Sequence, residues 1–93
     1  MRFEWDESKN RANRAKHGLW FEEAQSVFND EFARLFKDPD HSGNEDRFLL
    51  FGISGAGRCL IVVHCYRADD QIVRIISARR MTKKERKFYE EGI

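Results

Sequence analysis

The side chains best suited to chemistry in this sequence are a histidine, a lysine and a set of arginines. His17 is the leading candidate for proton transfer, because an imidazole titrates near neutral pH. Lys16 precedes it and could contact a phosphate group. The structural alternative for both residues is the end of a helix, where a cation interacts favourably with the helix dipole.

Arginines are concentrated at the boundaries of predicted strands. Arg79 ends the last predicted strand, and Arg67 ends the strand before it. Arg47 begins the strand series, while Arg74 lies in mid-strand, where it must face solvent or a groove or be paired. Guanidinium groups match the geometry of phosphate oxygens, so these positions favour an anionic partner.

Further candidates lie at the end of the last strand and on the helix expected after it. Tyr89 could stack on a nucleobase or donate a proton, or it could pack against the sheet. Lys83 belongs to a basic run that is either a solvated face or a surface for RNA or a partner. The candidate RNA-binding residues are Arg47, Arg74, Arg80, Lys83 and Tyr89.

The reaction that these side chains suit is cleavage of a phosphodiester without a metal. The sequence contains no metal-ligand signature, phosphate-binding loop, dinucleotide fingerprint or nucleophile elbow, so neither a metal nor a cofactor is expected. RNA supplies its own nucleophile, the 2′-hydroxyl. Arginines can stabilise the charge that develops on the phosphate, and histidine can move protons. The candidate catalytic residues are Lys16, His17, Arg67 and Arg79.

The charge distribution agrees with an anionic partner for one half of the chain. Residues 1–46 carry seven Lys and Arg against eleven Asp and Glu, whereas residues 47–93 carry ten against five. No stretch approaches the roughly 20 apolar residues of a membrane span. Cys59 and Cys65 are too far apart along one strand to pair with each other, which is typical of a reducing compartment. The cytoplasm is therefore the expected location.

Hydrophobic periodicity and turn residues predict eight elements. Asp6 can cap a first helix that ends at Gly18, and Thr82 with Glu85 forms a capping box for the last helix. In the first helix, Ala12 and Ala15 offer the apolar contact. Strands are expected over residues 2–5, 32–37, 47–54, 58–67 and 71–79, helices over 7–16, 21–29 and 82–90, and a polar loop over 38–46.

These elements follow the order β-α-α-β-β-β-β-α and predict an α+β fold. A chain of 93 residues has the length of one domain, so residues 1–93 are expected to form a single domain. Short turns join the last three strands, which predicts an antiparallel meander sheet covered by helices. His64 lies in the middle strand, where a sheet histidine with satisfied hydrogen bonds is the favoured interpretation.

Taken together, the chain resembles the BrnT toxins of type II toxin–antitoxin systems, and the resemblance covers nearly its whole length. The matching segments are Phe3-Glu4-Trp5-Asp6, Lys9-Asn10, Asn13, Lys16-His17-Gly18, Phe21-Glu22-Glu23-Ala24, Val27-Phe28, Glu45-Asp46-Arg47, Gly52, the run from Arg74 to Arg80, Thr82, Glu85 and Tyr89. Two departures are Trp20, where the family often has a serine that would cap the second helix, and Met81, where alanine is common. A tryptophan could instead pack as a hydrophobic staple.

The resemblance implies a RelE-like ribonuclease fold, metal-independent RNA cleavage and slowed translation. It also implies a BrnA-like antitoxin with a ribbon-helix-helix domain, and that antitoxin would contact operator DNA. Two alternatives remain open at this point. One is a catalytically inactive relative that acts as a corepressor, and the other is an RNA-binding or interaction domain of unrelated lineage.

Overall fold

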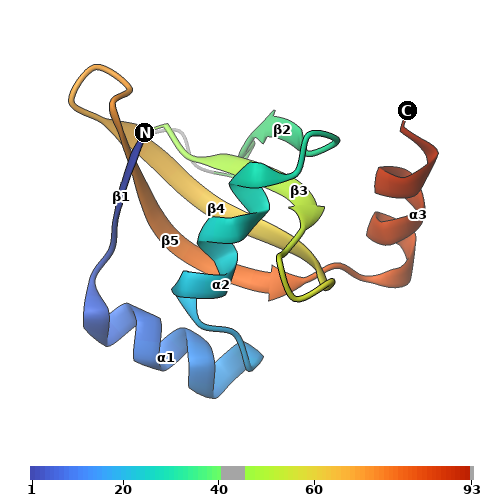
Figure 1. Cartoon of the computed structure of the whole chain (residues 1–93), viewed down its shortest axis with the longest axis horizontal. Helices are drawn as coiled ribbons and strands as arrows, with labels where there is room; N and C mark the ends of the chain where they lie inside the picture. The colour runs from blue at the N-terminus through green and yellow to red at the C-terminus, as the bar shows by residue number, and fades with distance from the viewer. Residues whose placement is uncertain (41–45, 93) are drawn as a thin grey trace.

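The computed structural model describes residues 1–40 and 46–92. Within these ranges the chain forms one five-stranded sheet and three α-helices (Figure 1). The strands are β1 (Arg2–Glu4), β2 (Arg34–Lys37), β3 (Phe48–Ile53), β4 (Cys59–Arg67) and β5 (Ile72–Arg80). The helices are α1 (Glu7–His17), α2 (Phe21–Ser26) and α3 (Lys83–Glu91), with a 3-10 turn, η1 (Val27–Asn29), directly after α2.

The sheet is mixed, which corrects the expectation of a purely antiparallel sheet. Its strand order is β1-β5-β4-β3-β2, and β3, β4 and β5 form the expected antiparallel meander. The short strand β1 runs parallel to β5 on the far edge and pairs with Ile72–Arg74. Alternation of apolar residues shows that a segment is a strand, but it does not show which strand lies beside it or in which direction.

Two element boundaries differ from the predicted ones by two residues or more, and the others agree to within one residue. The helix expected over 21–29 ends at Ser26 and continues as η1. The strand expected from Phe32 begins at Arg34, because the Asp30 carboxylate accepts the backbone N–H of Phe32 at 2.9 Å and holds the chain in a turn. Residues 41–45 of the predicted polar loop lie outside the described residues.

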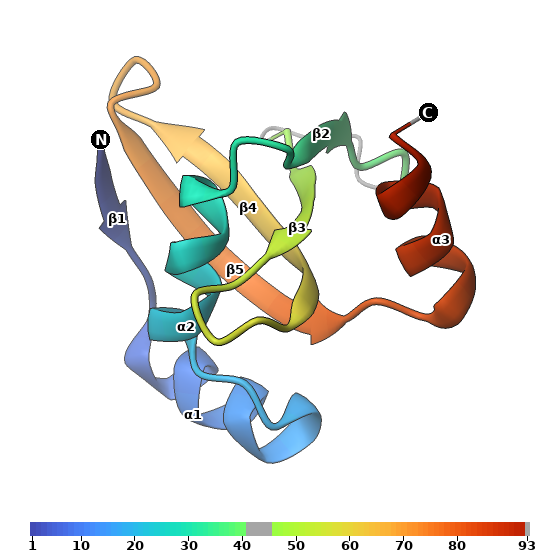
Figure 2. The same ribbon diagram turned by 45° about the vertical axis from the view of Figure 1, so that its right-hand side comes forward.

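Side chains of β4 point alternately into two cores on opposite faces of the sheet. Leu60 and Val62 face the main core, which they form with Phe21 and Ala24 of α2. Ile61 points the other way, into a smaller cluster that includes Tyr89 of α3. In Figure 2, α2 lies in front of the sheet and α3 lies at the right-hand side of the view. Burial on both faces agrees with the continuous apolar run of this strand.

Helix α1 buries a polar face, and its alanines are exposed. Asn10 and Asn13 are buried, whereas Ala12 and Ala15 lie on the solvent side, so the expected apolar contact through these alanines is wrong. Buried amides must find hydrogen-bond partners, and both asparagines do. The Asn13 amide donates to the Leu19 carbonyl at 2.9 Å, and its oxygen accepts the N–H of Ala78 at 3.1 Å. Helix α1 is therefore held against β5 by directed hydrogen bonds.

The start of α2 is capped from α1. Trp20 provides no side-chain cap and is 42% exposed, so it does not act as a buried staple. Instead the side-chain oxygen of Asn10 accepts the N–H of Phe21 at 2.7 Å, and its amide donates to Glu7 and Glu22 at 2.9 Å each. One buried side chain thus joins the two helices.

Two further expectations concern single residues. His64 is buried and its ring nitrogens lie 3.1 Å from the Val62 carbonyl and 3.2 Å from the Tyr66 hydroxyl, which confirms a satisfied sheet histidine. Neither Cys59 nor Cys65 forms a disulfide among the described residues, and Cys65 is buried while Cys59 is partly exposed. Across the described ranges, no helix combines the length and apolar character needed to cross a membrane.

Candidate active site

The candidate site is organised by a bulge in β5. Val63 pairs with Ser77 and the next residue, His64, pairs with Ile75, so Ile76 is an extra residue in β5. Without this insertion, Arg74 and Arg79 would face opposite sides of the sheet, because five residues separate them. The extra residue reverses the alternation and brings both arginines to one face.

The register defines the face that carries these arginines. Arg74 lies opposite Cys65 and Arg79 opposite Ile61, and both partners alternate with the core residues of β4. Arg67, two residues beyond Cys65, shares that face. This surface, which we call the arginine face, is defined by Arg67, Arg74 and Arg79 and lies on the side of α3. Arg67 and Arg79 are about 20 Å apart along the strands, so they cannot contact the same phosphate.

At one end of the arginine face, two guanidinium groups converge on one carboxylate. Arg74 donates to the Oε2 atom of Glu4 at 2.7 Å, and the Nε of Arg67 lies 3.7 Å from the same oxygen. Glu4 reaches this end from β1, where it pairs in register with Arg74.

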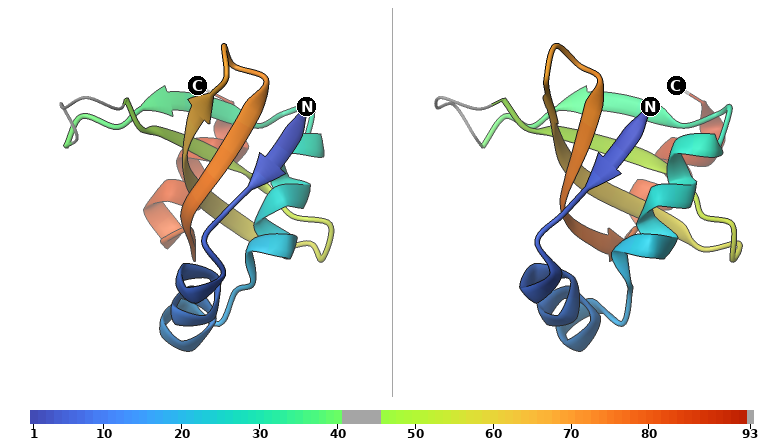
Figure 3. Two further views of the ribbon diagram at one scale, coloured as in Figure 1. Left: turned by 90° about the vertical axis from the view of Figure 1, so that its left-hand side faces the viewer. Right: turned by 60° about the vertical axis from the view of Figure 1, so that its left-hand side comes forward.

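Lys16 and His17 lie together beside the bulge. A shallow groove of about 260 Å³ runs between α1 and β5 and is lined by Lys9, Ala12, Asn13, Lys16, His17, Ile76 and Ser77. Figure 3 shows α1 below the end of β1, beside the lower part of β5. Along β5, the residues of the groove fall between Arg74 and Arg79. The structure therefore places the predicted histidine and lysine next to the strand that carries two predicted arginines.

At the other end of the arginine face, Arg79 forms a two-point ion pair with Glu85. Its two terminal nitrogens donate to the two carboxylate oxygens at 2.8 Å each. The hydrogen bonds from Arg79 lower the pKa of Glu85 to about 2, with a smaller contribution from the backbone of Thr82. The same pair raises the pKa of Arg79. Thr82 and Glu85 also form the capping box predicted from the sequence.

The remaining predicted residues are spread over the molecule. Tyr89 is buried at 8% exposure, and its hydroxyl donates to Asp30, so its ring packs against the sheet. Arg80 lies opposite Leu60 and therefore on the face away from Arg79. Lys83 is exposed at the start of α3. Arg47 immediately precedes β3, and its carbonyl accepts the N–H of Asp38 at 2.8 Å.

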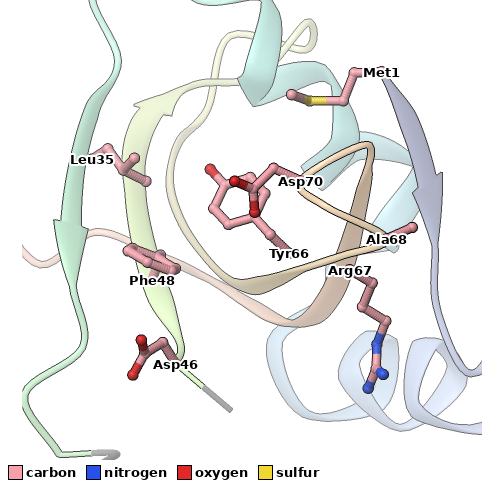
Figure 4. Close-up of a pocket in the computed structure, with 8 residues that line it drawn as sticks. All are labelled: Met1, Leu35, Asp46, Phe48, Tyr66, Arg67, Ala68 and Asp70. Carbon is pink, nitrogen blue, oxygen red and sulfur yellow. The ribbon is translucent and has the colours of Figure 1, made fainter.

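A hollow larger than this groove lies elsewhere on the described surface. It measures about 700 Å³ and is formed by residues at the far end of the sheet from Arg79 (Figure 4). Phe48 and Tyr66 line it, and the guanidinium of Arg67 points away from the centre. Its apolar rings and the nearby Asp70 do not suit a phosphate, so we assign the site by side-chain chemistry and not by size.

Sequence reasoning missed four side chains that the structure brings to this site: Lys9, Ser77, Glu4 and Glu85. Lys9 was detectable, because it precedes Lys16 by two helical turns and so shares its side of α1. Ser77 depends on the bulge, and Glu4 depends on the parallel pairing of β1. No group of three His, Cys, Asp or Glu side chains that could hold a metal ion occurs in the described parts of the chain.

Two comparisons with known proteins found similar proteins. Residues 5–85 match the model of a family described as the ribonuclease toxin BrnT of type II toxin–antitoxin systems. The chain is also similar to the crystal structure of the Brucella abortus ribonuclease toxin BrnT, with a TM-score of 0.68 and 25% sequence identity. That similarity covers 89% of this chain and 99% of the Brucella chain. A search of curated proteins returned no match.

Proposed function

Because the matched region spans residues 5–85, this chain belongs to the BrnT family of ribonuclease toxins of type II toxin–antitoxin systems, and we propose that it cleaves RNA without a metal ion at the groove between α1 and β5. The observation that carries this proposal is the β5 bulge, which sets Arg74 and Arg79 on one face on either side of Lys16 and His17. Its α+β fold is then a variant of the RelE-like ribonuclease fold.

The reaction uses the 2′-hydroxyl of RNA as the nucleophile. Attack on the adjacent phosphorus forms a 2′,3′-cyclic phosphate and expels the 5′-oxygen of the next nucleotide. One proton leaves the 2′-hydroxyl and one is delivered to the departing oxygen. We assign one of these transfers to His17, whose ring is partly exposed in the groove.

Positive side chains then stabilise the charge of the transition state. Lys16 adjoins His17 in the groove, and Arg79 lies two residues along β5 from Ser77. Fixed cations and hydrogen-bond donors beside a reacting phosphate contribute because they need no reorganisation during the reaction. Arg67 and Arg74 lie farther along the same face, where they would hold a neighbouring phosphate of the RNA strand.

The test is cleavage of RNA by the purified chain in the presence of EDTA. We expect products that end in 2′,3′-cyclic phosphate and 5′-hydroxyl groups. His17→Ala should lower the cleavage rate by about 10²–10⁴-fold, and Arg79→Ala by about 10²–10³-fold. Lys84→Ala, on the exposed side of α3, is the matched control and should cleave like the original chain. Loss of cleavage in EDTA would contradict the proposal. Products that end in 3′-hydroxyl and 5′-phosphate groups would contradict it as well.

The partner proposed for this chain is a BrnA-like antitoxin. Its ribbon-helix-helix domain would bind operator DNA, so this chain would reach DNA only through the antitoxin. We propose that the antitoxin covers part of the arginine face and that the complex acts in the cytoplasm, where free toxin slows translation. Co-expression with the product of a neighbouring small gene should restore growth and protect the backbone around Arg67 and Arg79 from hydrogen exchange. Unchanged exchange at both sites would contradict this placement.

A further inference from the structure

Glu85 connects the arginine face to the start of α3. Its Oε1 atom accepts hydrogen bonds from Nη1 of Arg79 and from the backbone N–H of Thr82, at 2.8 Å each. Its Oε2 atom accepts from Nη2 of Arg79 at 2.8 Å. One carboxylate thus caps the helix and holds both ends of the guanidinium fork, which fixes the direction of Arg79.

The guanidinium keeps two donors beyond this contact. Of its five N–H groups, two of the terminal ones meet Glu85 and a third points to the Arg80 carbonyl at 3.3 Å. The Nε–H and the second N–H of Nη2 remain, and no acceptor for them occurs among the described residues. These two N–H bonds are parallel and lie along one edge of the planar group, which is the geometry that grips two oxygens of a phosphate.

We propose that Glu85 is a positioning residue, which holds Arg79 so that its Nε–Nη2 edge is presented to a phosphodiester of the RNA. The inference rests on the proposed function and adds Glu85 as the residue that orients Arg79. The side chain of Arg79 is 42% exposed, so this edge has access to solvent. Because Glu85 neutralises the charge of Arg79, the contribution of Arg79 comes from directed hydrogen bonds and not from net charge.

The experiment is a double-mutant cycle that compares Glu85→Ala with and without Arg79→Ala. Two quantities are measured for each protein: the rate of RNA cleavage at saturating enzyme, and the affinity for an uncleavable mixed-sequence 2′-O-methyl oligoribonucleotide by fluorescence anisotropy. Thr82→Ala is the matched control, because it removes the other half of the capping box and leaves the Arg79–Glu85 pair in place. Circular dichroism establishes that each variant is folded.

With Arg79 present, Glu85→Ala should slow cleavage by about tenfold or more, as expected when a reacting group loses its alignment. In the Arg79→Ala background, the same change should alter affinity and rate by less than about twofold, because a residue that acts through Arg79 has nothing left to position. Thr82→Ala should stay within about twofold of the original chain in both assays.

Three results would overturn the inference. Equal losses from Glu85→Ala in both backgrounds, or an equal loss from Thr82→Ala, would show that Glu85 acts only through the stability of α3. Faster cleavage or tighter binding by Glu85→Ala would show that Glu85 masks Arg79. Normal cleavage and binding by the Arg79→Ala variant would contradict the proposed function itself, whereas the first two results would leave the proposed function intact.

Discussion

The side-chain oxygen of Asn13 accepts the backbone N–H of Ala78 at 3.1 Å, across 65 positions of the sequence. Strand β1 pairs with β5 only as far as Arg74, so the edge of β5 beyond it needs another partner. A buried backbone N–H without an acceptor costs about 1–3 kcal/mol. Asn13 meets that need and also fixes α1, and with it Lys16 and His17, beside the bulge.

Replacement of Asn13 should therefore destabilise the fold. Asn13→Ala leaves the N–H of Ala78 and the carbonyl of Leu19 without this partner, and we expect the free energy of unfolding to fall by about 2–4 kcal/mol. Urea denaturation followed by circular dichroism measures the loss. Asn29→Ala, at an exposed position in η1, should change stability by less than about 0.5 kcal/mol. Similar small effects for the two variants would show that the bridge contributes little.

Tyr89 is a core residue by its position, and its removal should affect stability and not RNA binding. Tyr89→Phe keeps the buried ring and removes the hydrogen bond to Asp30, which should lower the free energy of unfolding by about 1–2 kcal/mol. Asp30 keeps the backbone N–H groups of Phe32 and Ile53 as donors. Affinity for the 2′-O-methyl oligoribonucleotide should be unchanged. A clear loss of affinity in a folded protein would assign Tyr89 to the RNA site.

His64 should make the fold sensitive to mild acid. Burial lowers its pKa below the ordinary 6.5, against a smaller opposing effect of the Val62 carbonyl. Below pH 6.5 the unfolded chain takes up a proton at this position that the folded chain does not, so the unfolded state gains stability as the pH falls. The free energy of unfolding should drop more between about pH 7 and pH 5 for the original chain than for His64→Leu. Parallel pH profiles would refute this assignment.

Glu85 should also make the stability of the fold depend on pH, but in stronger acid than His64. The cause is a stabilised charge on Glu85, whereas for His64 it is the burial of a neutral ring. Its pKa is about 2 in the folded chain against an ordinary 4.5, because Arg79 stabilises the charged form. The stability from this pair is complete above pH 4.5 and is lost as the pH falls towards 2. Urea unfolding at about pH 5 and pH 3 should show a smaller decrease for Glu85→Gln than for the original chain. Glu31→Gln, at an exposed position, should behave like the original chain. An equal decrease for Glu85→Gln would argue against the pair.

Local signals in the sequence predicted the elements well. The caps at Asp6 and Thr82 are both present, because a capping side chain acts on N–H groups only two or three residues away. The continuous apolar run of β4 likewise predicts that this strand is buried on both faces, because the pattern depends only on the residues of the strand itself. Local signals could not predict which segment lies beside each edge of the sheet, because that depends on tertiary structure. The parallel pairing of β1 with β5 and the contact from Asn13 to β5 were therefore not predicted.

The candidate site shows the same division. Lys16, His17 and Arg79 were selected by residue type, and the structure places Lys16 and His17 of α1 beside β5, the strand that carries Arg79. Strict alternation would put Arg74 and Arg79 on opposite faces, and the single extra residue Ile76 reverses that outcome. A bulge has no reliable sequence signal, because it arises from the pairing of two strands. Tyr89 has the chemistry of a base-stacking residue, and its burial decides otherwise.

The groove between α1 and β5 joins residues 9–17 to Ile76 and Ser77, about sixty positions later in the chain. A chain that has been synthesised only as far as β4 therefore contains the histidine and the lysine but no strand to set beside them. Contacts between segments so far apart in the sequence are slow to form, because they require the closure of a long loop. Until β5 has been made and has docked, the chain therefore lacks the groove at which we propose that RNA is cleaved.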